Sequence, residues 1–164
     1  MEQKNYDFVG LIVKERNKAR LKATYEINYE MYSFFAYFGK EVSNSPFKKK
    51  YGDDFYRITS ESLLADNPEP SLIFSEENIK RIEKFYCFFE PEIESNQSII
   101  STFAYLPWED ICLIIEKCKS ISEALFYVKE TITNGWSNKA IRKAISSDLF
   151  NRTNNQRKED QKLH

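Results

Sequence analysis

The feature that most limits how this chain can fold is a stretch without proline over residues 5–44, in which glycine occurs only as Gly10 and Gly39. Its apolar residues recur every three or four positions, as Val9, Ile12, Ala19, Ala23, Ile27, Met31, Phe34 or Phe35, Phe38 and Val42. This spacing is typical of an amphipathic helix. One helix of about 38 residues would be roughly 57 Å long, which exceeds the diameter of a small domain. The stretch therefore predicts either one long helix, with dimerisation through residues 5–44 to cover the overhang, or two helices joined near Thr24–Tyr25.

The centre of the chain predicts two helices separated by a break that contains two prolines. Residues 43–54 are expected to form a loop, and the helix after it is expected to end near Asp66, because the following prolines disfavour helix. Ser75 is a natural N-cap, with two glutamates after it, for a helix that Pro91 is expected to end. The buried stripe of that helix is predicted to be Ile79, Ile82, Phe85 or Tyr86, and Phe89.

The C-terminal part predicts a loop over residues 92–103 and then three helices. Pro107 suits the first turn of one helix, a capping box beginning at Ser120 opens the next, and Ser137 caps the last, which is expected to end near Arg152. No pair of strands is convincing anywhere. The predicted fold class is therefore all-α, a helical bundle with a polar, frayed tail.

Charge is distributed unevenly, although the formal net charge is only −1. Lys and Arg outnumber Asp and Glu by ten to six over residues 1–50 and by seven to three over residues 131–164. Residues 51–130, in contrast, hold seven basic and sixteen acidic side chains. Basic ends around an acidic middle are expected either to meet nucleic acid on one face or to pair with that middle.

The residues that common catalytic and metal sites need are missing from the sequence. The single histidine is His164, and the only Glu-x-Lys of the kind found in metal-dependent nucleases is at residues 2–4, with no carboxylate motif before it. Cys87, Cys112 and Cys118 form no CxxC pair and are expected to be buried free thiols. We therefore expect no enzyme activity, no cofactor and no metal in this chain.

Neither an apolar run of about eighteen residues nor a secretory signal pattern is present in the sequence. We therefore expect a cytoplasmic protein without a membrane span.

Four blocks of sequence follow one another in an order and spacing that a known family shares. They are INYEMYSFFAYFGKEV (27–42), YGDDFYRITSESL (51–63) with NPEPSLIFSEENIKRIEKFY (67–86), LPW (106–108) and FYVKETITNGWSNKAIRKAI (126–145). Through these blocks, residues 8–152 resemble the N-terminal helical domain of the YhcG family of PD-(D/E)XK nucleases. The chain departs from the family pattern at Ile73, where the family has glycine, and at Ile82-Glu83, where it has Met-Arg.

The resemblance implies one helical domain over residues 1–152, with a helix-turn-helix-like unit at 51–89 that contacts DNA and C-terminal helices at 106–152; residues 153–164 would be the polar tail. The nuclease half of the family would lie on another segment. In this reading the helix that begins at Ser75 is the recognition element. Its residues expected to face DNA are Asn78, Lys80, Arg81 and Lys84. Asn and Arg can read base edges, while Lys favours phosphates; the glutamates at 76, 77 and 83 oppose this reading because they repel the DNA backbone.

Cations outside this helix are also expected to contribute to a positive surface. Those singled out are Lys48, Lys49 and Lys50 in the predicted loop and Arg142 and Lys143 on the last predicted helix. The sequence thus favours a non-catalytic DNA-binding module of a YhcG-type nuclease, or a free-standing relative. The alternative is a protein-interaction or oligomerisation adaptor from a mobile element that binds no nucleic acid, with Tyr51, Tyr56 and Tyr105 on its partner surface.

Overall fold

The computed structural model describes residues 2–66, 72–96 and 98–164, and these residues form helices and no strands. The α-helices, in chain order, are α1 Glu2–Ser43, α2 Phe47–Tyr51, α3 Phe55–Asp66, α4 Glu76–Ser95, α5 Ser98–Phe103, α6 Trp108–Lys117, α7 Ile121–Asn134, α8 Asn138–Ser146 and α9 Leu149–Lys162. Short 3₁₀ turns, Gly52–Asp54 and Leu72–Phe74, precede α3 and α4. The prediction of an all-α fold is confirmed.

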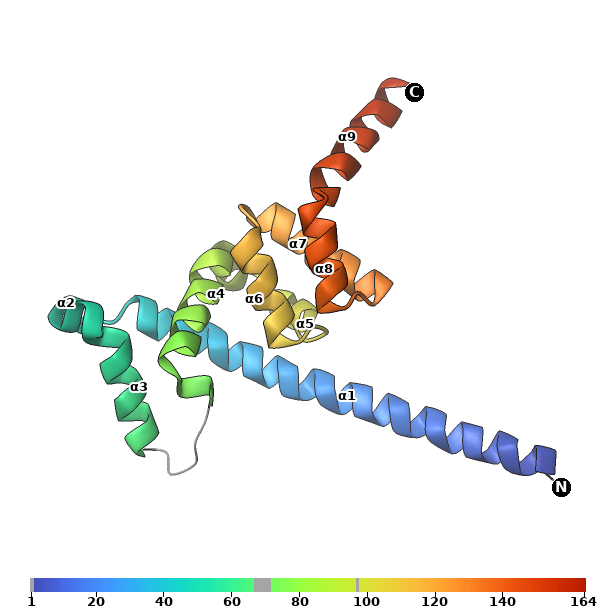
Figure 1. Cartoon of the computed structure of the whole chain (residues 1–164), viewed down its shortest axis with the longest axis horizontal. Helices are drawn as coiled ribbons and strands as arrows, with labels where there is room; N and C mark the ends of the chain where they lie inside the picture. Colours follow the sequence, from blue (N-terminus) through green and yellow to red (C-terminus); the bar gives the residue numbers. More distant parts are fainter. Residues whose placement is uncertain (1, 67–71, 97) are drawn as a thin grey trace.

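Helix α1 is a single helix of 42 residues, so the alternative with a junction near Thr24–Tyr25 is not what the chain adopts. Its C-terminal half lies against α4 and α5, where Tyr32 and Phe35 are buried. Its N-terminal half projects away from the other helices (Figure 1). There, large apolar side chains such as Leu11 and Ile12 are more than half exposed, at 63% and 56%.

Helix α4 is the centre of the core, because α1, α3, α5 and α6 all pack against it. The predicted stripe is confirmed: Ile79, Ile82, Phe85, Tyr86 and Phe89 are all buried. The rings of Phe85 and Phe89 contact Phe103 of α5 with centroids 5.4 and 4.8 Å apart. Edge and tilted ring contacts of this kind add to the burial of apolar area.

The crossing of α1 and α4 is close enough to require glycine at position 39. A Cβ atom built there would lie 2.6 Å from the Cβ of Tyr86 and 2.7 Å from the carbonyl oxygen of Ile82. The missing side chain thus lets the two helices touch through their backbones, which fixes α4 on α1.

The prediction that Pro91 ends its helix is wrong, because α4 continues to Ser95. A proline inside a helix removes one hydrogen bond, here the bond to the carbonyl of Cys87. Residue 87 is exposed, so water can satisfy that carbonyl. Phe89 and Ile93, on either side of the proline, are buried and hold both parts of the helix in the core.

Two segments predicted as loops contain short helices. Residues 92–103 hold the end of α4 and then α5, whose Ile99, Ile100 and Phe103 are buried. Residues 43–54 hold α2, so its lysines lie on a helical turn and not in a loop. Helices this short are stabilised by packing more than by their own propensity, which is why the sequence pattern did not show them.

The prediction that the chain frays after Arg152 is also wrong, because α9 runs from Leu149 to Lys162. The break lies earlier, at Asp148, whose φ of 53° is left-handed. The ring of Phe150 packs on Phe126 of α7 with centroids 5.4 Å apart. This contact anchors the first turn of α9, and the polar residues continue the helix from there.

The predicted N-caps are confirmed. The hydroxyls of Ser75, Ser120 and Ser137 each accept a hydrogen bond from the main-chain N–H three residues later, at 3.2, 3.1 and 3.2 Å. These caps set where α4, α7 and α8 begin and so fix which side chains of each helix face outward.

Candidate nucleic-acid interface

The outer face of α4 presents two lysines to solvent. Lys80 and Lys84 are both exposed and are one helical turn apart. The Nζ atom of Lys80 lies 3.3 Å from a carboxylate oxygen of Glu76. Lys84 has no ion-pair partner within the described part of the chain. Lys84 is thus available to an external anion.

Asn78 and Arg81, the other α4 residues expected to face DNA, hold neighbouring helices in place. The amide oxygen of Asn78 accepts a hydrogen bond from the indole N–H of Trp108 at 2.8 Å, and its amide nitrogen donates to the carbonyl of Ile73 at 3.0 Å. The guanidinium of Arg81 lies 3.1 Å from Glu77 and 3.2 Å from Glu109 at the start of α6. Both side chains therefore orient α4 relative to α6.

Helix α2 is joined to α4 through Glu83, whose side chain is only 12% exposed. Its carboxylate accepts hydrogen bonds from the Nζ of Lys48 and from the hydroxyl of Tyr56. The ring of Tyr56 lies between two cations, 5.7 Å from the Nζ of Lys48 and 5.3 Å from that of Lys80. Glu83 is thus neutralised inside the protein and does not present its charge to a phosphate backbone.

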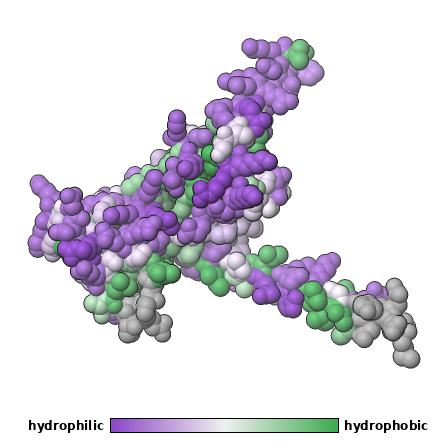
Figure 2. Space-filling view, viewed as in Figure 1, coloured by the Kyte–Doolittle hydropathy of each residue, from purple (hydrophilic) through white to green (hydrophobic). Residues whose placement is uncertain are grey.

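These contacts bring Lys48 of α2 and Lys80 of α4 to the same tyrosine ring, and three further lysines lie on the same two helices, which are about thirty residues apart in the sequence. We name them the α2–α4 basic cluster: Lys48, Lys49, Lys50, Lys80 and Lys84. Lys49 and Lys50 are exposed, and the end of the molecule that α2 forms is covered mostly by hydrophilic residues (Figure 2). Sequence reasoning had no way to find the roles of Tyr56 and Glu83, because no periodicity links them to α2.

Arg142 and Lys143 are exposed on α8, away from this cluster. Helix α6 packs against both α4 and α8 and separates them (Figure 1). The Nε of Arg142 donates to the amide oxygen of Asn138 at 3.1 Å, and the Asn138 amide donates to buried Asp110 at 2.9 Å. This pair is therefore a second, separate basic patch.

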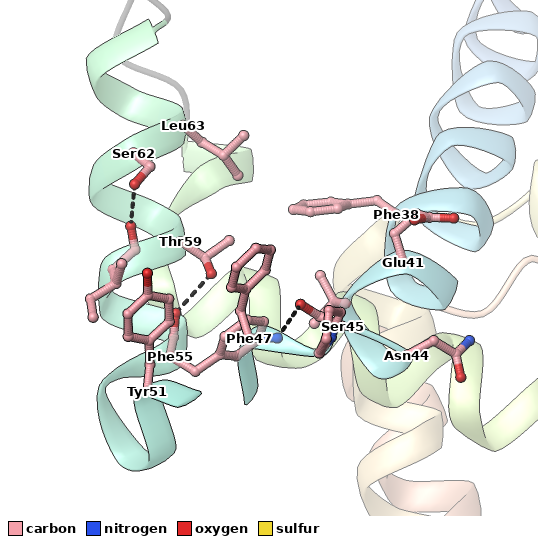
Figure 3. Close-up of a pocket in the computed structure, with 13 residues that line it drawn as sticks. Phe38, Glu41, Asn44, Ser45, Phe47, Tyr51, Phe55, Thr59, Ser62 and Leu63 are labelled. Atoms are coloured by element: carbon pink, nitrogen blue, oxygen red, sulfur yellow. Dashed lines mark hydrogen bonds between the residues drawn. The ribbon is translucent and has the colours of Figure 1, made fainter. Parts of the chain in front are cut away.

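A pocket of about 490 Å³ opens between the end of α1 and helices α2 and α3 (Figure 3). The rings of Phe38 and Phe55 and the side chain of Leu63 line it. Two of its hydroxyls donate to carbonyls of their own helix, that of Thr59 to Phe55 and that of Ser62 to Ile58, both at 2.8 Å. The lining contains one carboxylate, that of Glu41, and no histidine, cysteine or lysine. This arrangement suits an apolar side chain and lacks the paired groups that acid–base chemistry uses.

The three cysteines differ in exposure, and one prediction about them is corrected. Cys118 is buried and Cys112 is half-buried, and burial raises the pKa of each thiol to about 12. Cys87, expected to be buried, is exposed, because it lies on the outer side of α4 opposite the core stripe. Its thiol lies 3.4 Å from the hydroxyl of Ser43.

Residues 51–89, over which a helix-turn-helix-like unit is expected, contain α3, the greater part of α4 and the turns before them. Part of the connection, residues 67–71, lies outside the described residues. In the ranges that are described, no helix is both long and apolar enough to cross a bilayer. Nor do His, Cys, Asp and Glu side chains gather there in a group of three or more that could hold a metal ion.

Comparison with known proteins gives one match. A family model described as the DUF1016 N-terminal domain matches residues 12–152. No curated protein and no solved structure matches the chain.

Proposed function

The chain belongs to the DUF1016 N-terminal domain family, the N-terminal region of YhcG-type proteins, and we propose on that premise that it is a non-catalytic DNA-binding module. It acts in the cytoplasm, either attached to a PD-(D/E)XK nuclease domain or as a free-standing relative. The observation that carries the proposal is the α2–α4 basic cluster, in which Lys48 of α2 and Lys80 of α4 both lie near the ring of Tyr56.

Each part of the cluster has a distinct role in this proposal. Lys49, Lys50, Lys80 and Lys84 contact phosphates, because an ammonium group is a point charge that suits them. Lys48 holds Glu83 and so joins α2 to α4. Asn78 and Arg81 belong to the proposed surface as residues that orient α4, since their partners are Trp108, Glu77 and Glu109.

Binding dominated by phosphate contacts is largely independent of base sequence and falls steeply with salt. Arg142 and Lys143 contribute a second contact on α8, which a longer duplex reaches. A groove-reading role for α4 would in addition require Asn78 or Arg81 to leave its present partners, which favours phosphate contact over base readout.

The proposal is tested by fluorescence anisotropy with a labelled duplex of mixed sequence. The double variant Lys49→Glu/Lys50→Glu is compared with the control variant Lys117→Glu/Lys119→Glu. The control reverses the charge of two exposed lysines near the α6–α7 corner. We expect the first variant to lose about tenfold or more in affinity and the control to bind nearly as the wild type does. Equal affinities in both variants, or no DNA binding by the wild type, would contradict the proposal and favour the adaptor function.

The non-catalytic part of the proposal has its own assay. Purified protein is incubated with supercoiled plasmid and Mg²⁺ or Mn²⁺, and the expected product is uncut DNA. Cleavage that co-purifies with the protein and disappears on chelation of the metal would contradict it.

A further inference from the structure

The projecting half of α1 exposes apolar side chains in water along a helix that no other part of the described chain covers (Figure 2). Ile12 and Ile27 are 56% and 68% exposed, and Phe34 is 41% exposed although α1 is already packed on α4 at that level. A lone helix gains little stability in water without a packed apolar face. We therefore expect another helix or protein surface to pack along α1.

Some of the exposed apolar residues form one stripe on α1, on the side away from α4, while others, such as Leu11 and Leu21, are exposed on other sides of the helix. The stripe runs in steps of three or four residues through Ile12, Arg16, Ala19, Ala23, Ile27, Glu30 and Phe34, all of them exposed. Because successive helical residues are about 100° apart, these positions fall within roughly 80° of one another. We name this the outer stripe. The opposite side of the helix carries Tyr32, Phe35 and Gly39, which face α4.

The outer stripe is symmetric about Ala23. Ile12 and Phe34 are each eleven residues from Ala23, and Arg16 and Glu30 are each seven residues from it. Ala19 and Ile27 are each four residues from it, although alanine is the smaller side chain. The two halves match in spacing, and their charged members have opposite sign. A surface of this kind is complementary to itself when it is turned end over end.

We propose that the outer stripe binds the outer stripe of a second copy of this chain, with the two α1 helices antiparallel and crossing at Ala23. Each Arg16 then lies opposite the partner's Glu30, so that the pair forms twice. Each apolar end residue packs on the apolar end residue of the other copy, and the small alanines at the centre let the backbones approach.

A parallel pair in register does not suit this surface. It would place Arg16 opposite Arg16 of the second copy and Glu30 opposite Glu30 of the second copy, so like charges would repel at both positions. Charged residues within an apolar seam act mainly by selecting register and orientation. The contact from residue 12 to residue 34 is about 34 Å long, somewhat more than three heptads, the length over which such a repeat is diagnostic.

The antiparallel arrangement also leaves the rest of the molecule free. The core of each copy lies on the side of α1 opposite the outer stripe, so the two bodies sit at opposite ends of the pair. Lys14, Lys18 and Lys22, which recur every four residues, lie away from the stripe and stay exposed. The proposed dimer does not depend on DNA binding, so the two proposals can fail separately.

A charge-reversal experiment on the full chain tests the proposal. Sedimentation equilibrium is run on wild type, on Arg16→Glu, on Glu30→Arg, and on an equal mixture of the two variants. In a dimer of either variant alone, both pairs of facing charged residues have the same sign. We therefore expect the dissociation constant of that dimer to rise about tenfold. The mixture restores both opposite-charge pairs, and heterodimers should form with wild-type affinity. All substituted positions are exposed, so circular dichroism should show the same helix content throughout.

Cysteine cross-linking distinguishes the orientations directly. In a Cys87→Ser background, a mixture of Ile12→Cys and Phe34→Cys chains should form a disulfide-linked heterodimer under mild oxidation. Chains with Ile12→Cys alone should not form a disulfide-linked dimer, because the two cysteines lie at opposite ends of the contact between the two outer stripes. Efficient linkage of Ile12→Cys alone would overturn the antiparallel arrangement. A wild-type chain that stays monomeric up to high micromolar concentration, or variant mixtures that fail to recombine, would overturn the dimer.

Discussion

The crossing of α1 and α4 predicts a large effect from the smallest possible substitution, Gly39→Ala. The added Cβ would lie 2.6 Å from the Cβ of Tyr86 and 2.7 Å from the carbonyl oxygen of Ile82. Ordinary contacts between carbon atoms are about 3.5–4.0 Å. Neither neighbouring atom can rotate away, because one belongs to the backbone and the other is the first atom of a buried side chain. The two helices must therefore separate by about 1 Å at their closest point.

The expected magnitude follows from two opposing terms. Overpacking a tight core destabilises by about 1–3 kcal/mol, and the fixed position of both contacted atoms favours the upper end. Alanine in place of glycine recovers about 1 kcal/mol of helix propensity. The net loss is then about 2 kcal/mol, which lowers the melting temperature by roughly 4–8 °C for a domain of this size.

The assay is urea and thermal unfolding followed by circular dichroism. Gly10→Ala is the matched control, since it makes the same change in the same helix where no heavy atom lies within 4 Å of the new Cβ. We expect this control to unfold at the wild-type midpoint or slightly above it. A Gly39→Ala protein that is as stable as the wild type would refute the reasoning about the close approach.

Two further predictions concern single side chains. Asn78→Ala leaves the half-buried indole N–H of Trp108 without its acceptor and should lower the urea unfolding free energy by about 1–2 kcal/mol; an unchanged midpoint would show that water replaces the amide. At pH 8 the thiols of Cys112 and Cys118, each with a pKa raised to about 12, are ionised in about one molecule in ten thousand. Ellman's reagent should therefore label Cys87 quickly and the other two only slowly until urea is added, and equal rates in the native protein would contradict the assigned burial.

The features that sequence reasoning found are those that local chemistry determines. The caps at Ser75, Ser120 and Ser137 are set by side chains within three residues of the helix start. The buried stripe of α4 follows from spacing alone, and the outward position of Lys80 and Lys84 follows from that stripe.

The features that sequence reasoning missed depend on tertiary contacts. The helix continues through Pro91 because buried side chains on both sides of the proline outweigh the lost hydrogen bond. Helices α2 and α5 are too short to be signalled by periodicity and form because they pack. The contact of Glu83 with Lys48 and Tyr56 joins residues 35 and 27 positions apart. Nothing in the spacing of these residues indicates that they meet. The sequence alone therefore indicated that the carboxylate of Glu83 repels the DNA backbone.

The most direct measurement of DNA binding is the salt dependence of the affinity for a mixed-sequence duplex, followed by anisotropy. On a short duplex that does not reach Arg142 and Lys143, the four exposed lysines of the cluster, Lys49, Lys50, Lys80 and Lys84, predict a linear fall of log affinity against log salt with a slope of about −4. Binding that is absent at the lowest salt, or whose affinity does not change with salt, would contradict the proposal that this chain is a DNA-binding module.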